Sequence, residues 1–162
     1  MNLAHLHLLI NHLPVFGSIL GALVLLHGIY TKSNQTKIAA YNVFIISAIG
    51  ASIAYLTGEP AEETVENIPG IAKNLIEQHE DFAVVSLVAM IILGVISLVG
   101  LLLSYKKSPS SGLVATITLF IALVSFGLIA RTGYSGGQIR HTEIYNSSAT
   151  TAGETEESDS SN

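Results

Sequence analysis

Histidine is the residue type in this sequence that is best suited to chemistry. Of the six histidines, His5, His7 and His12 stand close together where a long apolar segment begins, just before Pro14. An imidazole can ligate a metal ion or haem iron. An ionisable side chain at the edge of a membrane span is costly to desolvate and is therefore functional by default. We expect this stretch to supply part of a ligand cluster.

Two more histidines border later apolar segments. His79 precedes the third segment, and His141 follows the fourth. If each segment crosses a membrane once, all but one of the histidines lie on the same side: His5, His7, His12, His79 and His141. Only His27 then lies near the opposite side. The sequence thus predicts a histidine cluster on one face of a membrane bundle.

Haem b suits such a cluster, because it is held without covalent attachment and its iron can take imidazoles from different helices of a bundle. The candidate axial ligands are His7, His12, His79 and His141, and the candidate partners of the haem propionates are Arg131 and Arg140. We expect His12 to point inward just inside the start of the first span, with His79 as its best partner. One or two haems would be bound in this way.

Two alternatives stay open at this point. A bare zinc, copper or iron ion would suit His12, His79 and His141, with Glu80 or Asp81 nearby, because these ions accept imidazole and carboxylate ligands. Such a protein would bind or transport the ion. In the other alternative the histidines are incidental and the chain is a structural subunit without a cofactor. The absence of cysteine excludes thiolate zinc sites, iron–sulfur clusters and covalently attached haem.

Four apolar segments must position these side chains. The sequence is 49% hydrophobic and only 12% charged, whereas a soluble domain is about 25% charged. Each segment is close to the ~20 residues that cross a bilayer core. The predicted spans are about 8–29, 38–56, 82–103 and 113–130. We therefore expect an all-α, four-transmembrane-helix bundle in contact with membrane lipid.

The chain is expected to form one membrane domain, residues 1–145, followed by a tail. Residues 146–162 are rich in Ser, Thr and Glu and have almost no apolar side chain, which predicts a disordered acidic tail. The net charge of −5 excludes the basic surface on which nucleic-acid binding depends.

Asn11 and Pro14 decide how the first membrane helix begins. If Asn11 is the N-cap, the helix begins at His12, Pro14 falls in its first turn, and residues 3–10 form a separate segment. The alternative is one continuous helix that is kinked at Pro14. We favour the first interpretation.

Two further segments adjoin the spans. Residues 71–81 have apolar positions at roughly helical spacing, which predicts an amphipathic lead-in that runs into the third span. The glycine-rich residues 131–141 predict a flexible, tightly turning segment after the fourth span, with room for a haem ring.

The basic residues predict the orientation in the membrane. The short polar turns contain Lys32, Lys37, Lys106 and Lys107, whereas the other side has Lys73, Arg131 and Arg140 among many acidic residues. By the positive-inside rule the short turns are cytoplasmic. Both termini and the 57–81 loop then lie outside, which in the inner membrane of a bacterium means the periplasm.

These motifs, taken in order, resemble a bacterial family of four-helix membrane proteins of uncharacterised function, DUF2231. The resemblance covers about residues 5–145 and is carried by the spacing of His7, His12 and Pro14, by Thr57-Gly58, by His79, by the glycine-rich run 132–137 and by Arg140-His141. Leu8 stands where the family has Pro. The resemblance implies a four-helix membrane fold and redox work beside c-type cytochrome modules.

The function predicted from these observations is that of a membrane-bound, b-type cytochrome-like protein. It would pass electrons between a quinol in the bilayer and a periplasmic carrier such as a cytochrome c. The protein would ligate, bury and tune the haem, as an electron-transfer component and not as a stand-alone enzyme. It could act as a homo- or hetero-oligomer.

Overall fold

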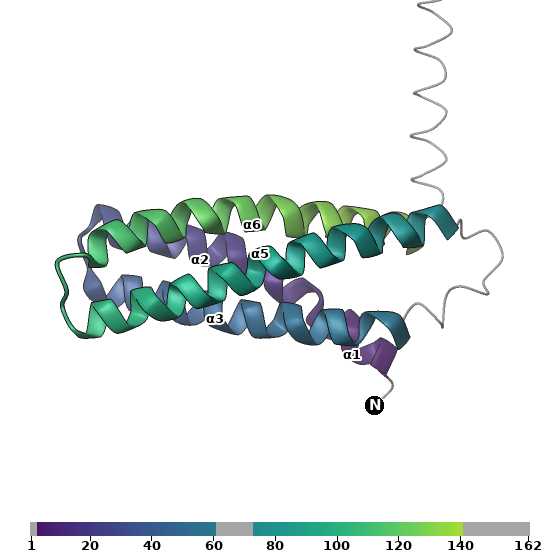
Figure 1. Ribbon diagram of the computed structural model, residues 1–162, viewed down its shortest axis with the longest axis horizontal. Helices are drawn as coiled ribbons and strands as arrows, with labels where there is room; N and C mark the ends of the chain where they lie inside the picture. The colour runs from purple at the N-terminus through teal and green to yellow at the C-terminus, as the bar shows by residue number, and fades with distance from the viewer. Residues whose placement is uncertain (1–2, 61–72, 141–162) are drawn as a thin grey trace, which may run out of the picture.

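The structure is a computed structural model, which describes residues 3–60 and 73–140. Its described helices are α1 (Leu3–Ile10), α2 (His12–Tyr30), α3 (Asn34–Leu56), α5 (Lys73–Tyr105) and α6 (Ser111–Arg140). The four long helices lie side by side in an elongated bundle, with α1 at one end (Figure 1). The predicted all-α four-helix bundle is confirmed.

Among the described residues, four stretches are long and apolar enough to cross a membrane: Leu3–Tyr30, Asn34–Leu56, Ile76–Tyr105 and Ser111–Ile139. The side-chain distribution agrees with a lipid surround. Large apolar side chains such as Phe16, Leu20 and Phe120 are exposed, while alanine, serine, threonine and glycine recur among the buried residues. Small interior residues let membrane helices approach closely. The chain is thus a multi-pass membrane protein by the length and composition of its helices.

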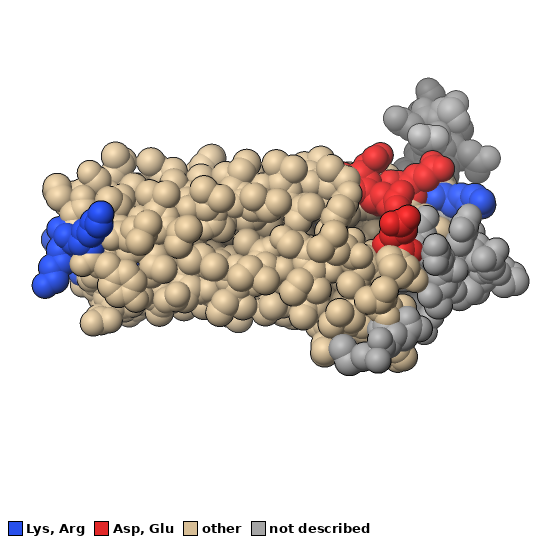
Figure 2. Space-filling view, turned by 60° about the horizontal axis from the view of Figure 1, so that its bottom comes forward, with Lys and Arg blue, Asp and Glu red and all other residues tan. Residues whose placement is uncertain are grey.

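The bundle has two chemically different ends. We call the end with the turns 31–33 and 106–110 the lysine end, and the end with α1 and the start of α5 the histidine end. Figure 2 shows basic side chains at the lysine end and acidic ones near the histidine end. The exposed acidic side chains of the described residues there are Glu59, Glu77, Glu80 and Asp81.

The two turns at the lysine end have the same construction. Lys32 and Lys107 have positive φ angles of 54° and 50°. After each lysine the chain closes a Schellman motif, in which Ser33 N–H donates to Gly28 O at 3.0 Å and Ser108 N–H donates to Leu103 O at 3.0 Å. Each turn therefore ends its helix in the same way, but the next helix starts differently: Ser33 is the N-cap of α3, whereas α6 begins at Ser111, three residues after Ser108.

This likeness extends along both hairpins, α2–α3 and α5–α6. Most of the buried positions of α2 recur as buried positions of α5 at a constant offset of 72 residues, which takes Pro14 to Ser86 and Gly28 to Gly100. Those of α3 recur in α6 at an offset of 78 residues: Ala40, Phe44, Ser47, Ala51 and Ala54 correspond to Thr118, Ala122, Ser125, Ile129 and Thr132.

The packing of the helices agrees with a two-fold repeat. Helix α2 packs against α3 and α6, and α5 packs against α6 and α3. Exchanging one hairpin for the other leaves this set of neighbours unchanged. The inward positions follow spacings of three and four residues, which is the seven-residue period of left-handed helix packing. The bundle is thus a pair of similar hairpins around a common long axis.

Helix α2 begins at His12, after Asn11, as the favoured interpretation predicted. Asn11 does not cap the helix with its side chain, and its φ and ψ of −61° and −22° are helical. Its N–H donates to His7 O at 2.9 Å. The predicted helical lead-in to the third span is confirmed over residues 73–81, because α5 is continuous from Lys73; residues 71–72 lie outside the described part of the chain.

The expectation of a turning segment after the fourth span is wrong over residues 131–140. Helix α6 continues to Arg140 and includes Gly133, Gly136 and Gly137. Thr132 and Ser135 bury this end of α6 against α5, and this packing outweighs the low helix propensity of glycine. His141 and the predicted tail, 146–162, lie outside the described residues.

Candidate functional site

His7 lies on α1 at the histidine end and reaches the end of α3. Its Nδ1–H donates to the carbonyl of Ala54 at 2.9 Å. Thr57 Oγ1 lies 3.4 Å from the same nitrogen. Its hydroxyl has two acceptors within reach, Ile53 O at 2.8 Å and the Ala54 carbonyl at 3.1 Å. Gly58 borders the ring, since a Cβ there would lie 3.9 Å from His7 Cε1. The imidazole is partly buried and held at one edge.

His79 lies near the start of α5 and reaches α6 in the same manner. Its Nδ1–H donates to the carbonyl of Thr132 at 3.0 Å. Ser135 Oγ lies 3.1 Å from that nitrogen and donates to the Thr132 carbonyl at 2.9 Å. A Cβ on Gly136 would lie only 2.9 Å from His79 Cε1. The imidazole ring therefore occupies the space that a side chain at position 136 would fill.

The two histidines occupy repeated half-sites. In each, the accepting carbonyl belongs to residue i, a hydroxyl residue stands at i+3 and a glycine at i+4: Ala54, Thr57 and Gly58 for His7, and Thr132, Ser135 and Gly136 for His79. A side chain at i+4 would lie over the carbonyl of residue i on a helix. Glycine at that position leaves the carbonyl open to an imidazole from another helix.

This arrangement fixes the tautomer of both neutral rings. A carbonyl oxygen only accepts hydrogen bonds, so Nδ1 must carry the proton in each ring and Nε2 keeps its lone pair. Metal-ligating histidines are commonly oriented in this way, by an Nδ1–H that donates to a backbone carbonyl. His7 and His79 also lie close enough for their charges to interact. The structure thus places two of the predicted ligands, one from α1 and one from α5, at the same end of the bundle.

His12 does not point into the bundle, and the expectation of an inward orientation is wrong. Its side chain is exposed, and its ring meets Phe16 edge-on with 6.4 Å between the centroids. The buried residue of this turn is Pro14. Two positions along a helix correspond to a rotation of about 200°, so the burial of Pro14 turns His12 outward.

Arg131 is exposed and packs on aromatic rings. Its guanidinium carbon lies 4.9 Å from the centre of the Phe82 ring and 5.5 Å from that of Tyr134. Such contacts suit an anchor at a membrane surface, where aromatic and basic side chains gather. Its role toward a propionate stays a prediction, as does that of Arg140, whose side chain lies outside the described part of the structure.

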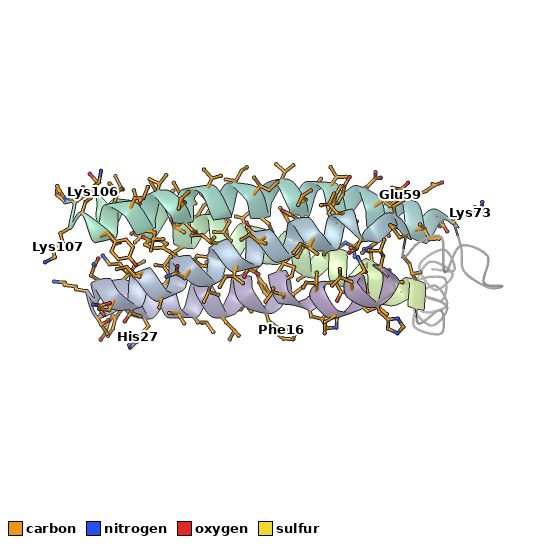
Figure 3. All side chains as sticks on the ribbon, turned by 90° about the horizontal axis from the view of Figure 1, so that it is seen from below. Phe16, His27, Glu59, Lys73, Lys106 and Lys107 are labelled. Carbon is orange, nitrogen blue, oxygen red and sulfur yellow. The ribbon has the colours of Figure 1, made fainter. Side chains whose placement is uncertain are left out.

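The other histidines of the described segments lie apart from the pair. His5 is exposed on α1, and His27 lies on the outer face of α2 toward the lysine end (Figure 3). A shallow groove of about 360 Å³ beside His27 is lined by Leu23, Leu26 and Tyr30. His141 is not described. The predicted five-histidine cluster is therefore represented by two histidines in the described structure.

The donor set of these two half-sites fits haem iron. Within residues 3–60 and 73–140, no three His, Cys, Asp or Glu side chains are grouped to hold a metal ion. A zinc ion takes three or four protein ligands, whereas haem iron needs only its two axial positions from protein. A pair of imidazoles from different helices would supply those two positions if haem were bound.

The sequence motifs Thr57-Gly58 and 132–137 were recognised, but their role in orienting the imidazoles was not predicted. Thr57-Gly58 and Ser135-Gly136 are each a hydroxyl residue followed by glycine, and they stand 78 residues apart, as do the corresponding buried positions of α3 and α6. That repeat is the signal in the sequence that could have identified this role.

Comparison of the chain with models of known protein families, with curated proteins and with solved structures gives no match. The resemblance to DUF2231 stays a prediction from the sequence motifs.

Proposed function

We propose that this chain is a membrane-bound, b-type cytochrome-like electron-transfer protein in which His7 and His79 are the axial ligands of one haem b. The observation that carries the proposal is the repeated half-site, with Nδ1 of each imidazole bonded to a carbonyl at 2.9 Å and 3.0 Å. The two axial positions of haem iron are equivalent. The two-fold repeat of the bundle presents two similar imidazoles, which suits two equivalent ligand positions.

Haem b, when bound, supplies one-electron oxidation and reduction of its iron. The chain's own residues orient the ligands. The carbonyls of Ala54 and Thr132 hold each imidazole in one tautomer and make its Nε2 a better donor. Ser135 donates to the Thr132 carbonyl, and the Thr57 hydroxyl lies within hydrogen-bonding distance of both Ile53 O and Ala54 O.

The depth of the pair in the membrane supports exchange of electrons with a water-soluble partner. Phe82, Arg131 and Tyr134 form an aromatic and basic group at one level of the bundle. Tyr105 lies at the lysine end, about 35 Å away along the rise of α5, which is close to the thickness of a bilayer core. His79 precedes Phe82 on α5 and so lies at the water-facing edge.

The lysine end is then cytoplasmic, by the positive-inside rule, and the histidine end faces the periplasm of a bacterium across its inner membrane. The exposed acidic residues at that end, Glu77, Glu80 and Asp81, suit a basic periplasmic carrier such as a cytochrome c. A quinol in the bilayer would be the other redox partner.

A metal ion held by the same imidazoles is the second candidate. Glu80 lies near enough to interact electrostatically with His79, and a carboxylate beside an imidazole suits zinc, copper or iron. This candidate needs at least one more ligand, for which His141 would be available in sequence.

The test is to express the chain with haem supplied and to purify it in detergent. We expect a Soret band and a pyridine haemochrome spectrum that give one haem b per chain. The variants His7→Ala and His79→Ala should each lose at least nine-tenths of the haem, because one imidazole is a much weaker ligand set than two. His12→Ala and His27→Ala are matched controls and should keep it.

Helical circular dichroism of each variant shows whether it folds. Folded protein without haem, or full haem in both His7→Ala and His79→Ala, contradicts the proposal. Elemental analysis distinguishes the second candidate, which requires one metal ion per chain without porphyrin.

A further inference from the structure

Three fully buried hydroxyl groups lie between α3 and α5 toward the lysine end. They belong to Tyr41, Ser97 and Ser104, each with 0% of its surface exposed. By distance and angle none of the three makes a hydrogen bond to another described residue, although the Ser104 hydroxyl is close enough to Tyr41 to interact with it. A buried hydroxyl without a partner loses the hydrogen bonds that it made to water, which is unfavourable.

The Tyr41 hydroxyl lies against Gly100, and the two serines flank Gly100 on α5. A Cβ on Gly100 would lie 2.8 Å from Tyr41 Oη, so the phenol oxygen lies against the α5 backbone. Ser97 and Ser104 stand three residues before and four residues after Gly100, which places them on the same face of α5. Ser104 Oγ lies near Tyr41 Oη, but without the geometry of a direct hydrogen bond.

Other buried hydroxyls of the bundle are satisfied. Ser47 donates to Val43 O at 2.7 Å, Thr118 to Val114 O at 2.8 Å and Ser125 to Ala89 O at 3.2 Å. A serine can turn to a carbonyl of its own helix in this way. A tyrosine hydroxyl is too far from its own backbone to do so, and Tyr41 therefore needs a partner from elsewhere.

The two-fold repeat provides an internal comparison. The residue of α2 that corresponds to Ser97 is Leu25, and the residue of α6 that corresponds to Tyr41 is Leu119. Both leucines belong to or pack against the apolar core. The polar group thus occurs in the α3–α5 seam and is replaced by leucine in the equivalent α2–α6 seam.

We propose that the α3–α5 seam binds ordered water between Tyr41, Ser97 and Ser104. The ligand must both donate and accept hydrogen bonds, because all three groups are hydroxyls. It must be neutral, because the buried polar side chains of the described residues carry no charge. It must also be small, because the three side chains are fully enclosed. Buried water is the usual partner of such groups.

Asn34 marks the side from which water would exchange. Its Nδ2 donates to Ser104 O at 3.0 Å, and the residue is only partly buried at the lysine end. The proposal does not depend on haem, since the seam lies at the opposite end of the bundle from His7 and His79.

The first test uses the sign of a stability change. Tyr41→Phe removes one hydroxyl and keeps the ring. If water is bound, it loses a partner, and the apparent melting temperature of the detergent-solubilised protein should fall by about 3 °C. If the hydroxyl has no partner, its removal leaves the temperature unchanged or raises it, and either result overturns the proposal. Tyr30→Phe, at a tyrosine that is 85% exposed, is the matched control.

The second test detects the water itself. Radiolytic hydroxyl-radical footprinting in ¹⁸O-labelled water oxidises buried side chains that contact bound water. Tyr41 should take up ¹⁸O, whereas Phe44, an aromatic residue of the same helix that is also 0% exposed, should not. Replacing both Ser97 and Ser104 by Ala should reduce the labelling of Tyr41 several-fold. Equal labelling of Tyr41 and Phe44 in the wild-type protein overturns the proposal.

Discussion

The two hairpins of this bundle have the same arrangement of key residues and differ in the contacts between their helices. Both carry a histidine at one end, a hydroxyl–glycine pair that receives it, and a lysine with positive φ at the other end. The first hairpin interrupts its helix at Asn11, whereas the second runs unbroken through α5. The shared features are those that hold the imidazoles and close the turns, which indicates where the arrangement is constrained.

The hairpins also differ in the contact between their own two helices. Ser86 and Thr132 bond to each other at 2.8 Å in the second hairpin, and the corresponding residues of the first are Pro14 and Ala54. The contact between the two helices of a hairpin therefore accommodates either hydrogen-bonded hydroxyls or apolar side chains, provided that the side chains are small. Variants at matched positions of the two hairpins can test each part of this comparison.

The largest change in the free energy of unfolding is expected when a glycine that faces a neighbouring helix is replaced by alanine. A Cβ on Gly100 would lie 2.5 Å from a ring carbon of the buried Tyr41, whereas one on the corresponding Gly28 would lie 3.0 Å from Lys37 N. Gly100→Ala should lower the free energy of unfolding by about 2 kcal/mol, and Gly28→Ala by about 1 kcal/mol.

Unfolding by sodium dodecyl sulfate, followed by circular dichroism, measures these changes. Gly127→Ala is the control, because nothing lies within 4 Å of its added Cβ; it should be neutral or stabilising. Equal losses at Gly100 and Gly127 would show that the close approach of Tyr41 is not a constraint.

A second comparison separates the two half-sites. A Cβ on Gly136 would lie 2.9 Å from His79 Cε1, and one on Gly58 would lie 3.9 Å from His7 Cε1. Gly136→Ala should displace the imidazole from the Thr132 carbonyl, lower the free energy of unfolding by about 1.5 kcal/mol and weaken haem binding about tenfold. Gly58→Ala should leave both quantities nearly unchanged.

Imidazole ¹⁵N resonances of the haem-free protein measure the displacement directly. His79 should carry its proton on Nδ1 in the wild-type protein and lose that preference in Gly136→Ala. A preserved Nδ1–H tautomer in this variant would sink the proposed role of Gly136.

Hydrophobic segment length was enough to predict the four helices and the common end of His7 and His79. The orientation of His12 was not predictable in the same way, because it depends on the break at Asn11 and on the burial of Pro14. A shift of one or two residues in helical phase exchanges the inward and outward faces. The membrane segments alone do not determine that phase.

The partners of the imidazoles were hidden for a different reason. Ala54 and Thr132 act through their backbone carbonyls, which every residue possesses. Glycine at 133, 136 and 137 suggested a turn by composition, yet contacts with α5 keep this stretch helical. Tertiary packing thus decided what local propensity left open.

A third prediction concerns the turns that both hairpins share. Lys32 and Lys107 adopt left-handed φ angles of 54° and 50°, which cost a non-glycine residue about 1 kcal/mol. Lys32→Gly and Lys107→Gly should each raise the free energy of unfolding by about 1 kcal/mol, and by equal amounts. Lys106→Gly, next to a lysine of positive φ but not itself in that conformation, should not. Detergent unfolding checks all three.

The smallest effect is expected for the hydroxyl pair that distinguishes the second hairpin. Thr132→Ala introduces the residue that the first hairpin has at Ala54 and removes the 2.8 Å bond to Ser86. The Thr132 carbonyl stays in place, so the bond from His79 is kept and haem content should not change. Hydrogen bonds between membrane helices contribute about 0.6 kcal/mol on average.

A double-mutant cycle of Thr132→Ala with Ser86→Ala measures this contribution in isolation. The coupling energy should be about 0.6 kcal/mol, since each single variant breaks the same bond. Thr132 Oγ1 also donates to Phe82 O at 3.1 Å, and that contact enters the Thr132→Ala value alone. A coupling near zero with unchanged haem content would mean that the hydroxyls of Ser86 and Thr132 do not hold α5 and α6 together. The contact would then depend on close packing of small side chains, as at Pro14 and Ala54 of the first hairpin.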